Sequence, residues 1–84
     1  MENAVKLSVI IIAKNEAEMI SDCINSCKTI SDSEIIVIDD ESEDSTVELA
    51  QKMGAKVFSH KKKDFAELRN FGASKASGEW LLYI

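Results

Sequence analysis

The segment Leu7-Ser8-Val9-Ile10-Ile11-Ile12-Ala13 decides the fold that we expect for this chain. It is rich in β-branched residues and almost continuously apolar, which is typical of a strand covered on both faces. Ile35-Ile36-Val37-Ile38 has the same character further along the chain. Strands of this kind occur in parallel sheets that carry helices on both sides, so the segment predicts an α/β fold.

Strand and helix signals alternate along the chain in the order β-α-β-α-β-α-β. The strands are expected at residues 7–13, 35–38, 56–59 and 80–84. The helices are expected to begin near Asn15, near Ser45 and at Asp64, because each of these residues is followed three positions later by a glutamate, as in a capping box. Right-handed crossovers then favour a Rossmann-like, three-layer half-sheet that is mainly parallel, with strand order 3-2-1-4.

The inward faces follow from the spacing of apolar residues. In the third helix we expect Phe65 and Leu68 to point inward, and in the last strand we expect Trp80 and Tyr83 to lie in the core. Because the chain stops within the apolar run 80–84, we expect it to be part of a longer protein, with self-association through the unpaired edge of the last strand.

Composition limits the classes of protein to which the chain belongs. Its 84 residues, 45% hydrophobic and 30% charged, suit one small globular domain. A net charge of −5 argues against a nucleic-acid partner. No apolar run is long enough to span a bilayer, and the N-terminus lacks the basic start of a secretory signal. Cys23 and Cys27 have neither redox nor zinc spacing, so we expect reduced thiols in a cytoplasmic protein.

Ligands of open parallel sheets bind beyond the carboxyl ends of the strands, where the strand order reverses. Here that point lies between the first and fourth strands, and the loops that reach it begin with Ala13-Lys14-Asn15-Glu16 and Asp39-Asp40-Glu41-Ser42. Neither loop contains G-x-G-x-x-G or a P-loop motif. A standard dinucleotide site is therefore disfavoured.

The second loop is strongly acidic, with five carboxylates between residues 39 and 44. An ionised carboxylate only accepts hydrogen bonds, so it pairs with the N3–H of uracil or with ribose hydroxyls and repels the N3 lone pair of cytosine. We expect Asp39 and Asp40, at the end of the strand, to bind such a ligand. Glu41, Glu43 and Asp44 are expected to remain in solvent and to favour the start of the second helix.

Two roles suit Arg69 of the third helix equally. Its guanidinium is suited to a bidentate grip on a pyrophosphate, and it is also an ordinary surface residue of a helix.

Four segments resemble the sequence blocks of family 2 glycosyltransferases, in the order and spacing of that family. They are Leu7–Glu16 for the opening strand and T-x-N-E loop, Ile36–Thr46 for V-V-D-D-x-S-x-D-x-T, Arg69–Gly72 for R-N-x-G, and Ala76–Ile84 for A-x-G-E-[WY]-[IL]. The chain is also similar to the branch that includes bacterial lipopolysaccharide-core β-glucosyltransferases. Lys14 departs from the pattern, because many members have a tyrosine there that stacks on uracil.

The resemblance implies a GT-A fold in which residues 1–84 are the N-terminal nucleotide-sugar-binding portion of an inverting glycosyltransferase. The parent enzyme would move a hexose from a UDP-sugar to a saccharide or lipid-linked acceptor, with peripheral membrane association as a further expectation. By position, Ala13 and Glu16 contact uridine, Asp40 meets the uracil imide, Asp39 is the next candidate, and Arg69 orders the site or the phosphates.

In the pattern of the family, the metal-binding D-x-D motif would begin at the position after Ile84. The resemblance therefore implies a divalent metal, Mg or Mn, in the full-length parent, and neither a complete metal site nor a catalytic residue within these 84 residues. We expect the chain alone to be inactive.

A second hypothesis belongs to another class, a non-catalytic βαβ module with a regulatory or interaction role. A receiver domain is less favoured still, because its acidic pair follows the first strand and here the pair follows the second.

Overall fold

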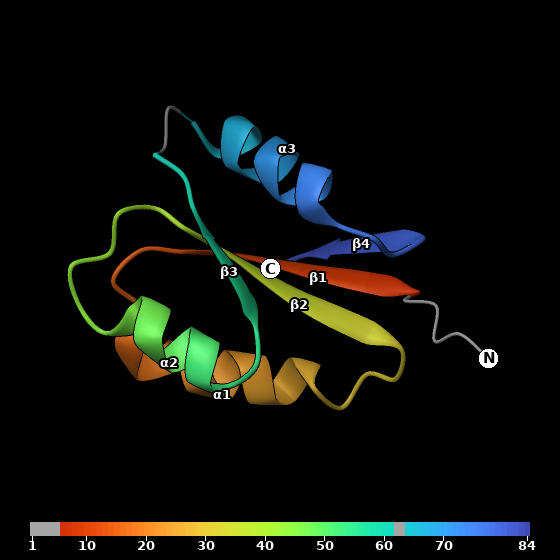
Figure 1. The fold of residues 1–84 in the computed structure, drawn as a ribbon, viewed down its shortest axis with the longest axis horizontal. Coiled ribbons are helices and arrows are strands. Elements are labelled where there is room, and N and C mark those ends of the chain that lie inside the picture. Colours follow the sequence, from red (N-terminus) through yellow and green to blue (C-terminus); the bar gives the residue numbers. More distant parts are fainter. Residues whose placement is uncertain (1–5, 62–63) are drawn as a thin grey trace.

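A computed structural model describes residues 6–61 and 64–84, which form three layers (Figure 1). The elements in chain order are β1 (Leu7–Ala13), α1 (Ala17–Cys27), β2 (Ser33–Asp39), α2 (Thr46–Lys52), β3 (Lys56–Ser59), α3 (Phe65–Lys75) and β4 (Trp80–Tyr83). Helices α1 and α2 cover one side of the sheet and α3 covers the other. The expectation that the N-terminus is not a secretory signal concerns residues 1–5, which lie outside the residues that the structure describes.

The four strands form one parallel sheet in the order β3-β2-β1-β4, which confirms the predicted topology. The register places Ala13 opposite Asp39, so β1 and β2 end side by side. Ile10 lies opposite Tyr83, so β4 ends three residues before the end of β1 is reached. The order reverses at β1, so the position at which a ligand is expected lies between β1 and β4.

Successive side chains of β1 point to opposite faces of the sheet and pack in two separate cores, because a strand is pleated. Val9 and Ile11 face α1 and α2, whereas Ile10 faces α3 together with Leu68. Gly72 permits the close approach of α3, because a Cβ at this position would lie 2.6 Å from Cγ2 of Ile10. Both faces of the central strands are thus buried, as their continuous apolar sequence predicted.

The prediction that Trp80 and Tyr83 lie in the core is wrong. Their exposed fractions are 70% and 39%, because β4 pairs only with β1 in the described residues and α3 packs mainly over β1 and β2. Phe65 was also expected to point inward, but it is 57% exposed, since Leu68 and Gly72 form the buried side of α3.

The helix starts agree only partly with the capping pairs in the sequence. The carboxylate of Asp64 accepts the N–H of Glu67 at 2.8 Å, so this cap is confirmed. Asn15 does not cap α1, which begins after Glu16. Instead, Asn15 has a left-handed backbone with φ of 52°, and its side-chain oxygen accepts the N–H of Glu43 at 2.7 Å.

Glu34 precedes the strand expected at residues 35–38, but it lies in β2 and is only 8% exposed. Its carboxylate accepts hydrogen bonds from the Ser8 hydroxyl (2.5 Å), from Lys56 Nζ (2.9 Å) and from the N–H of Ser77 (2.6 Å). Burial opposes ionisation, yet these hydrogen bonds together outweigh it and lower the pKa of Glu34 to about 2. The cluster joins the segment before β4 to β1, β2 and β3 at the amino ends of the strands.

Candidate functional site

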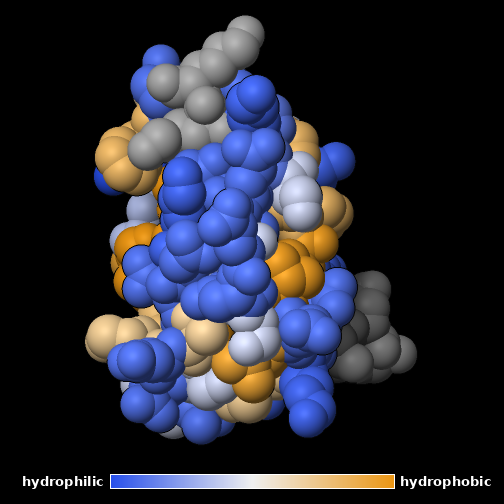
Figure 2. Space-filling model, turned by 90° about the vertical axis from the view of Figure 1, so that its left-hand side faces the viewer, coloured by the Kyte–Doolittle hydropathy of each residue, from blue (hydrophilic) through white to orange (hydrophobic). Residues whose placement is uncertain are grey.

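The carboxyl ends of β1 and β2 form the end of the sheet where a ligand is expected. The N–H of Asp40 donates to the carbonyl oxygen of Ala13 at 2.9 Å, which keeps the two strand ends together. Figure 2 looks onto this end of the molecule, where hydrophilic residues form a band flanked by hydrophobic patches. The loops after β1 and β2 therefore present a polar surface above an apolar sheet.

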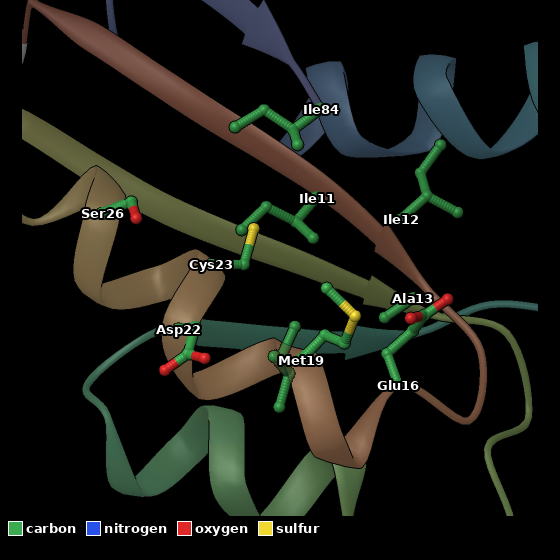
Figure 3. Close-up of a pocket in the computed structure, with 10 residues that line it drawn as sticks. Ile11, Ile12, Ala13, Glu16, Met19, Asp22, Cys23, Ser26 and Ile84 are labelled. Atoms are coloured by element: carbon green, nitrogen blue, oxygen red, sulfur yellow. The ribbon is translucent and has the colours of Figure 1, made fainter.

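A hollow of about 360 Å³ opens beside this end, between α1 and the β4 side of the sheet (Figure 3). Its lining residues are Ile11, Ile12, Ala13, Glu16, Met19, Ile20, Asp22, Cys23, Ser26 and Ile84. Most of them are apolar, with a few polar groups at the rim, which is typical of a small-molecule site. Two of the predicted site residues, Ala13 and Glu16, line it.

The two aspartates at the end of β2 are buried, with exposed fractions of 3% for Asp39 and 4% for Asp40. The oxygens of Asp39 accept the N–H of Ser42 at 3.0 Å and its hydroxyl at 2.5 Å. Asp39 thus holds its own loop in shape. Asp40 is tied to the end of β1 through its main chain, next to the hollow that Ala13 lines. Ligand contact by either carboxylate stays a prediction.

Arg69 is exposed on α3, on the other side of the sheet from α1. Its guanidinium carbon lies 5.9 Å from the centre of the Tyr83 ring, at the end of β4. The structure does not bring Arg69 into the hollow. It places the arginine beside Tyr83, the last residue of β4.

The sequence reasoning missed how the two loops are joined. Two side chains of the loop after β2 and one from the first residue of α2 accept the main-chain N–H groups of residues 15–17, which lead into α1. The pairs are Asn15 N–H to Ser42 Oγ (2.8 Å), Glu16 N–H to Thr46 Oγ1 (2.8 Å) and Ala17 N–H to Asp44 Oδ2 (3.2 Å). The D-x-S-x-D-x-T spacing carried this signal, because it supplies an acceptor at every second position.

Asp44 also serves α2, as expected from its position before that helix. Its Oδ1 accepts the N–H of Thr46 at 3.0 Å and the Thr46 hydroxyl. The hydroxyl of Thr46, with these main-chain donors, lowers the pKa of Asp44. Glu41 and Glu43 are exposed, in agreement with the prediction that they remain in solvent.

Within residues 6–61 and 64–84, no group of three or more His, Cys, Asp or Glu side chains is arranged to hold a metal ion. The helices of this same part of the chain are all too short or too polar to cross a membrane.

Cys23 and Cys27 are free thiols on the side of α1 that packs on the core, and burial raises the pKa of Cys27.

The family model described as glycosyl transferase family 2 matches residues 8–84. The chain belongs to this family. An uncharacterized glycosyltransferase of Rickettsia conorii is 42% identical over 79 residues, which cover 94% of this chain and 28% of the relative. A cholesterol galactosyltransferase of Borreliella burgdorferi is 41% identical over 87 residues, with 93% of this chain and 24% of the relative covered. The chain thus spans about a quarter of the length of these family members.

Solved glycosyltransferase structures share the fold. Glucosyl-3-phosphoglycerate synthase from Mycobacterium tuberculosis, in complex with Mn²⁺, UDP and glucosyl-3-phosphoglycerate, superposes with a TM-score of 0.74. It is 29% identical, and the match covers 94% of this chain and 32% of the synthase. A mannosyltransferase from Pyrobaculum calidifontis, in complex with GDP-Man and Mn²⁺, gives a TM-score of 0.75 at 20% identity, covering 88% of this chain and 25% of that one. The predicted GT-A arrangement is therefore confirmed.

Proposed function

We propose that residues 1–84 are the donor-binding portion of an inverting glycosyltransferase that uses a UDP-sugar. The observation that carries this proposal is the meeting of the β1 and β2 ends beside a partly apolar hollow, in a chain of family 2. The synthase that is 29% identical binds UDP in its solved complex, which supports uridine as the nucleoside of the donor.

The uridine is proposed to lie against Ala13 and Glu16, both of which line the hollow. Asp40 is the residue proposed to accept the N3–H of uracil, because it directly follows β2 and its main chain is bound to Ala13, which lines the hollow. Asp39 is proposed to shape the loop through Ser42 and only secondarily to meet the donor. Arg69 is proposed to act at the β4 side, where it lies over Tyr83.

In the parent protein, we propose that an acceptor hydroxyl attacks the anomeric carbon while a carboxylate base takes its proton and the nucleoside diphosphate departs. The acceptor is proposed to be a saccharide or a lipid-linked saccharide, as in lipopolysaccharide-core synthesis, in the cytoplasm and at the membrane surface. The base is proposed to lie outside residues 1–84. The 84-residue chain is accordingly proposed to bind the donor without transferring sugar.

Within residues 6–61 and 64–84 no group of three or more possible ligands is arranged to hold a divalent metal, and two of the loop carboxylates, Asp39 and Asp44, accept hydrogen bonds from Ser42, Ala17 and Thr46. Both solved neighbours contain Mn²⁺. We propose that the parent takes Mg or Mn through an Asp-x-Asp segment outside residues 1–84, and we assign it no step in this chain.

Calorimetric titration of the 84-residue chain with UDP and with CDP tests the proposal. We expect measurable binding of UDP, and CDP binding weaker by about tenfold, because the carboxylate loses a hydrogen bond and faces a lone pair. Equal affinity for the two nucleotides contradicts the assignment of Asp40. If neither nucleotide binds, the alternative of a non-catalytic βαβ module is favoured. Measurable transfer of sugar by the purified chain contradicts its proposed inactivity.

A further inference from the structure

Side chains at the start of α2 and in the loop before it accept the main-chain N–H groups at the start of α1. We propose that Thr46 and Asp44 are positioning residues of the donor site, which fix the wall formed by Ala13 and Glu16. This inference rests on the proposed donor-binding function. The juxtaposition that carries it is the acceptance of the Glu16 N–H by Thr46 Oγ1 at 2.8 Å and of the Ala17 N–H by Asp44 Oδ2 at 3.2 Å.

Thr46 is held in one orientation. It is fully buried, its hydroxyl accepts from Glu16 and donates to Asp44 Oδ1, and its own N–H also donates to Asp44 Oδ1 at 3.0 Å. A threonine hydroxyl has only one proton to donate. If the Thr46 hydroxyl turned to donate this proton to another acceptor, its hydrogen bond to Asp44 would break. The network therefore has a single arrangement, and buried polar networks that are fully satisfied are rigid.

In a further hydrogen bond, the loop after β1 supplies the acceptor and the loop after β2 supplies the donor. The side-chain oxygen of Asn15 accepts the N–H of Glu43 at 2.7 Å, while the N–H of Asn15 donates to Ser42 Oγ at 2.8 Å. Asn15 adopts a left-handed backbone to make both bonds, with φ of 52°. The loop after β1 is thus fixed at both ends to the loop after β2.

This closure has a consequence for anion binding. Main-chain N–H groups at the start of a helix commonly bind phosphate. Here the N–H groups of residues 15–17 are occupied by Ser42, Thr46 and Asp44, and the last of these is a carboxylate. These three N–H groups therefore belong to a rigid wall for the nucleoside part of the donor, and none of the three is left to hold its diphosphate.

The effect on the hollow follows from its lining. Glu16 both donates to Thr46 and lines the hollow, and Ala13 lies three residues before it. Loss of the Thr46 hydroxyl leaves the Glu16 N–H without its acceptor and releases this wall. A released wall has to be ordered again when the donor binds, which weakens binding.

The test compares three variants of the 84-residue chain. Thr46→Val removes the hydroxyl at nearly constant volume, Thr46→Ser retains it, and Ser45→Ala removes a hydroxyl from the adjacent position, where the side chain makes no cap hydrogen bond. Amide hydrogen exchange at Glu16, read by NMR, reports the closure directly. Calorimetry with UDP reports the donor site, and exchange at Ile10 and Ile36 in the sheet reports global stability.

For Thr46→Val we expect exchange at Glu16 to become about tenfold faster and the Kd for UDP to rise about three- to tenfold, while exchange at Ile10 and Ile36 changes much less. Thr46→Ser is expected to restore both values and Ser45→Ala to change neither. If Thr46→Val does not fold, Asp44→Asn provides the same test from the exposed side of the network, with exchange read at Ala17.

Two results overturn the positioning role while leaving the proposed function standing. One is unchanged UDP affinity in Thr46→Val despite faster exchange at Glu16. The other is a shift of the residue 15–17 amide resonances when inorganic pyrophosphate is added to the unsubstituted chain, because this would make the start of α1 an anion site. Absence of UDP binding in the unsubstituted chain overturns the proposed function itself, and the positioning role with it.

Discussion

The N–H of Asp40 donates to the carbonyl oxygen of Ala13 across 2.9 Å, one residue beyond the last paired position of β1 and β2. The parallel ladder therefore continues into the loop, and the acidic residue is held against the end of the neighbouring strand. Asp40 is only 4% exposed in this position. The donor-site assignment depends on this placement, which a solvated acidic loop would not provide.

Asp40→Asn is expected to raise the Kd for UDP by about tenfold or more, because the amide no longer offers a charged acceptor to the uracil N3–H. Glu43→Gln is the matched control, since it removes one negative charge from the same loop at an exposed position. Calorimetry on both variants separates a specific contact from a general effect of loop charge. Equal loss of affinity in the two variants would count against a direct contact.

Glu34 makes the stability of the fold depend on acid pH. Its pKa is lowered from 4.5 to about 2 in the folded chain, so the stabilisation is complete above about pH 4.5 and is lost as the pH falls towards 2. The shift corresponds to about 3 kcal/mol. We expect Glu34→Gln to lower the free energy of unfolding by about 2–3 kcal/mol at pH 7 and by little at pH 2, measured by urea denaturation.

The control for Glu34 is Glu48→Gln, which neutralises an exposed glutamate of α2. It is expected to change the unfolding free energy by less than about 0.5 kcal/mol at either pH. A Glu34→Gln difference that is the same at pH 7 and pH 2 would show that the carboxylate charge is not the stabilising feature.

Gly78→Ala is expected to destabilise the fold by about 1–3 kcal/mol. An added Cβ would lie 2.7 Å from the Ser8 hydroxyl and 2.8 Å from the Ser8 main-chain nitrogen, so the backbone before β4 would have to move. Gly54→Asn is a suitable control, because that glycine has φ of +90° with nothing within 4 Å, and asparagine tolerates left-handed backbone. Thermal unfolding of both variants measures the difference, and equal melting temperatures would contradict the close approach.

We also expect the 84-residue chain to self-associate through β4. The strand pairs only with β1 among the described residues, and Leu81 and Leu82 are 42% and 41% exposed. An apolar edge of this kind pairs with other chains, and a lysine on it prevents this. Light scattering should therefore report dimers or larger species, and Leu82→Lys should shift them towards the monomer, whereas Gln51→Lys on α2 should not. A monodisperse monomer of the unsubstituted chain at high concentration would refute the prediction.

Much of the fold could be predicted because the strands identify themselves locally. β1 and the centre of β2 are apolar on both faces, and only a parallel sheet between helices buries such strands. The expected core position of Trp80 failed for a related reason. Apolar character shows that a residue can be buried, whereas its 70% exposure depends on which elements pack beside β4.

The amino-acid sequence by itself determined the order of elements, the strand order 3-2-1-4 and the family, because these follow from periodicity, crossover handedness and short local motifs. The tertiary structure alone decided how the polar groups pair. The bonds from Asn15 to Ser42 and from Glu16 to Thr46 join residues 27 and 30 positions apart. Their partners become neighbours only when β1 and β2 align in register, and no local propensity encodes that distance.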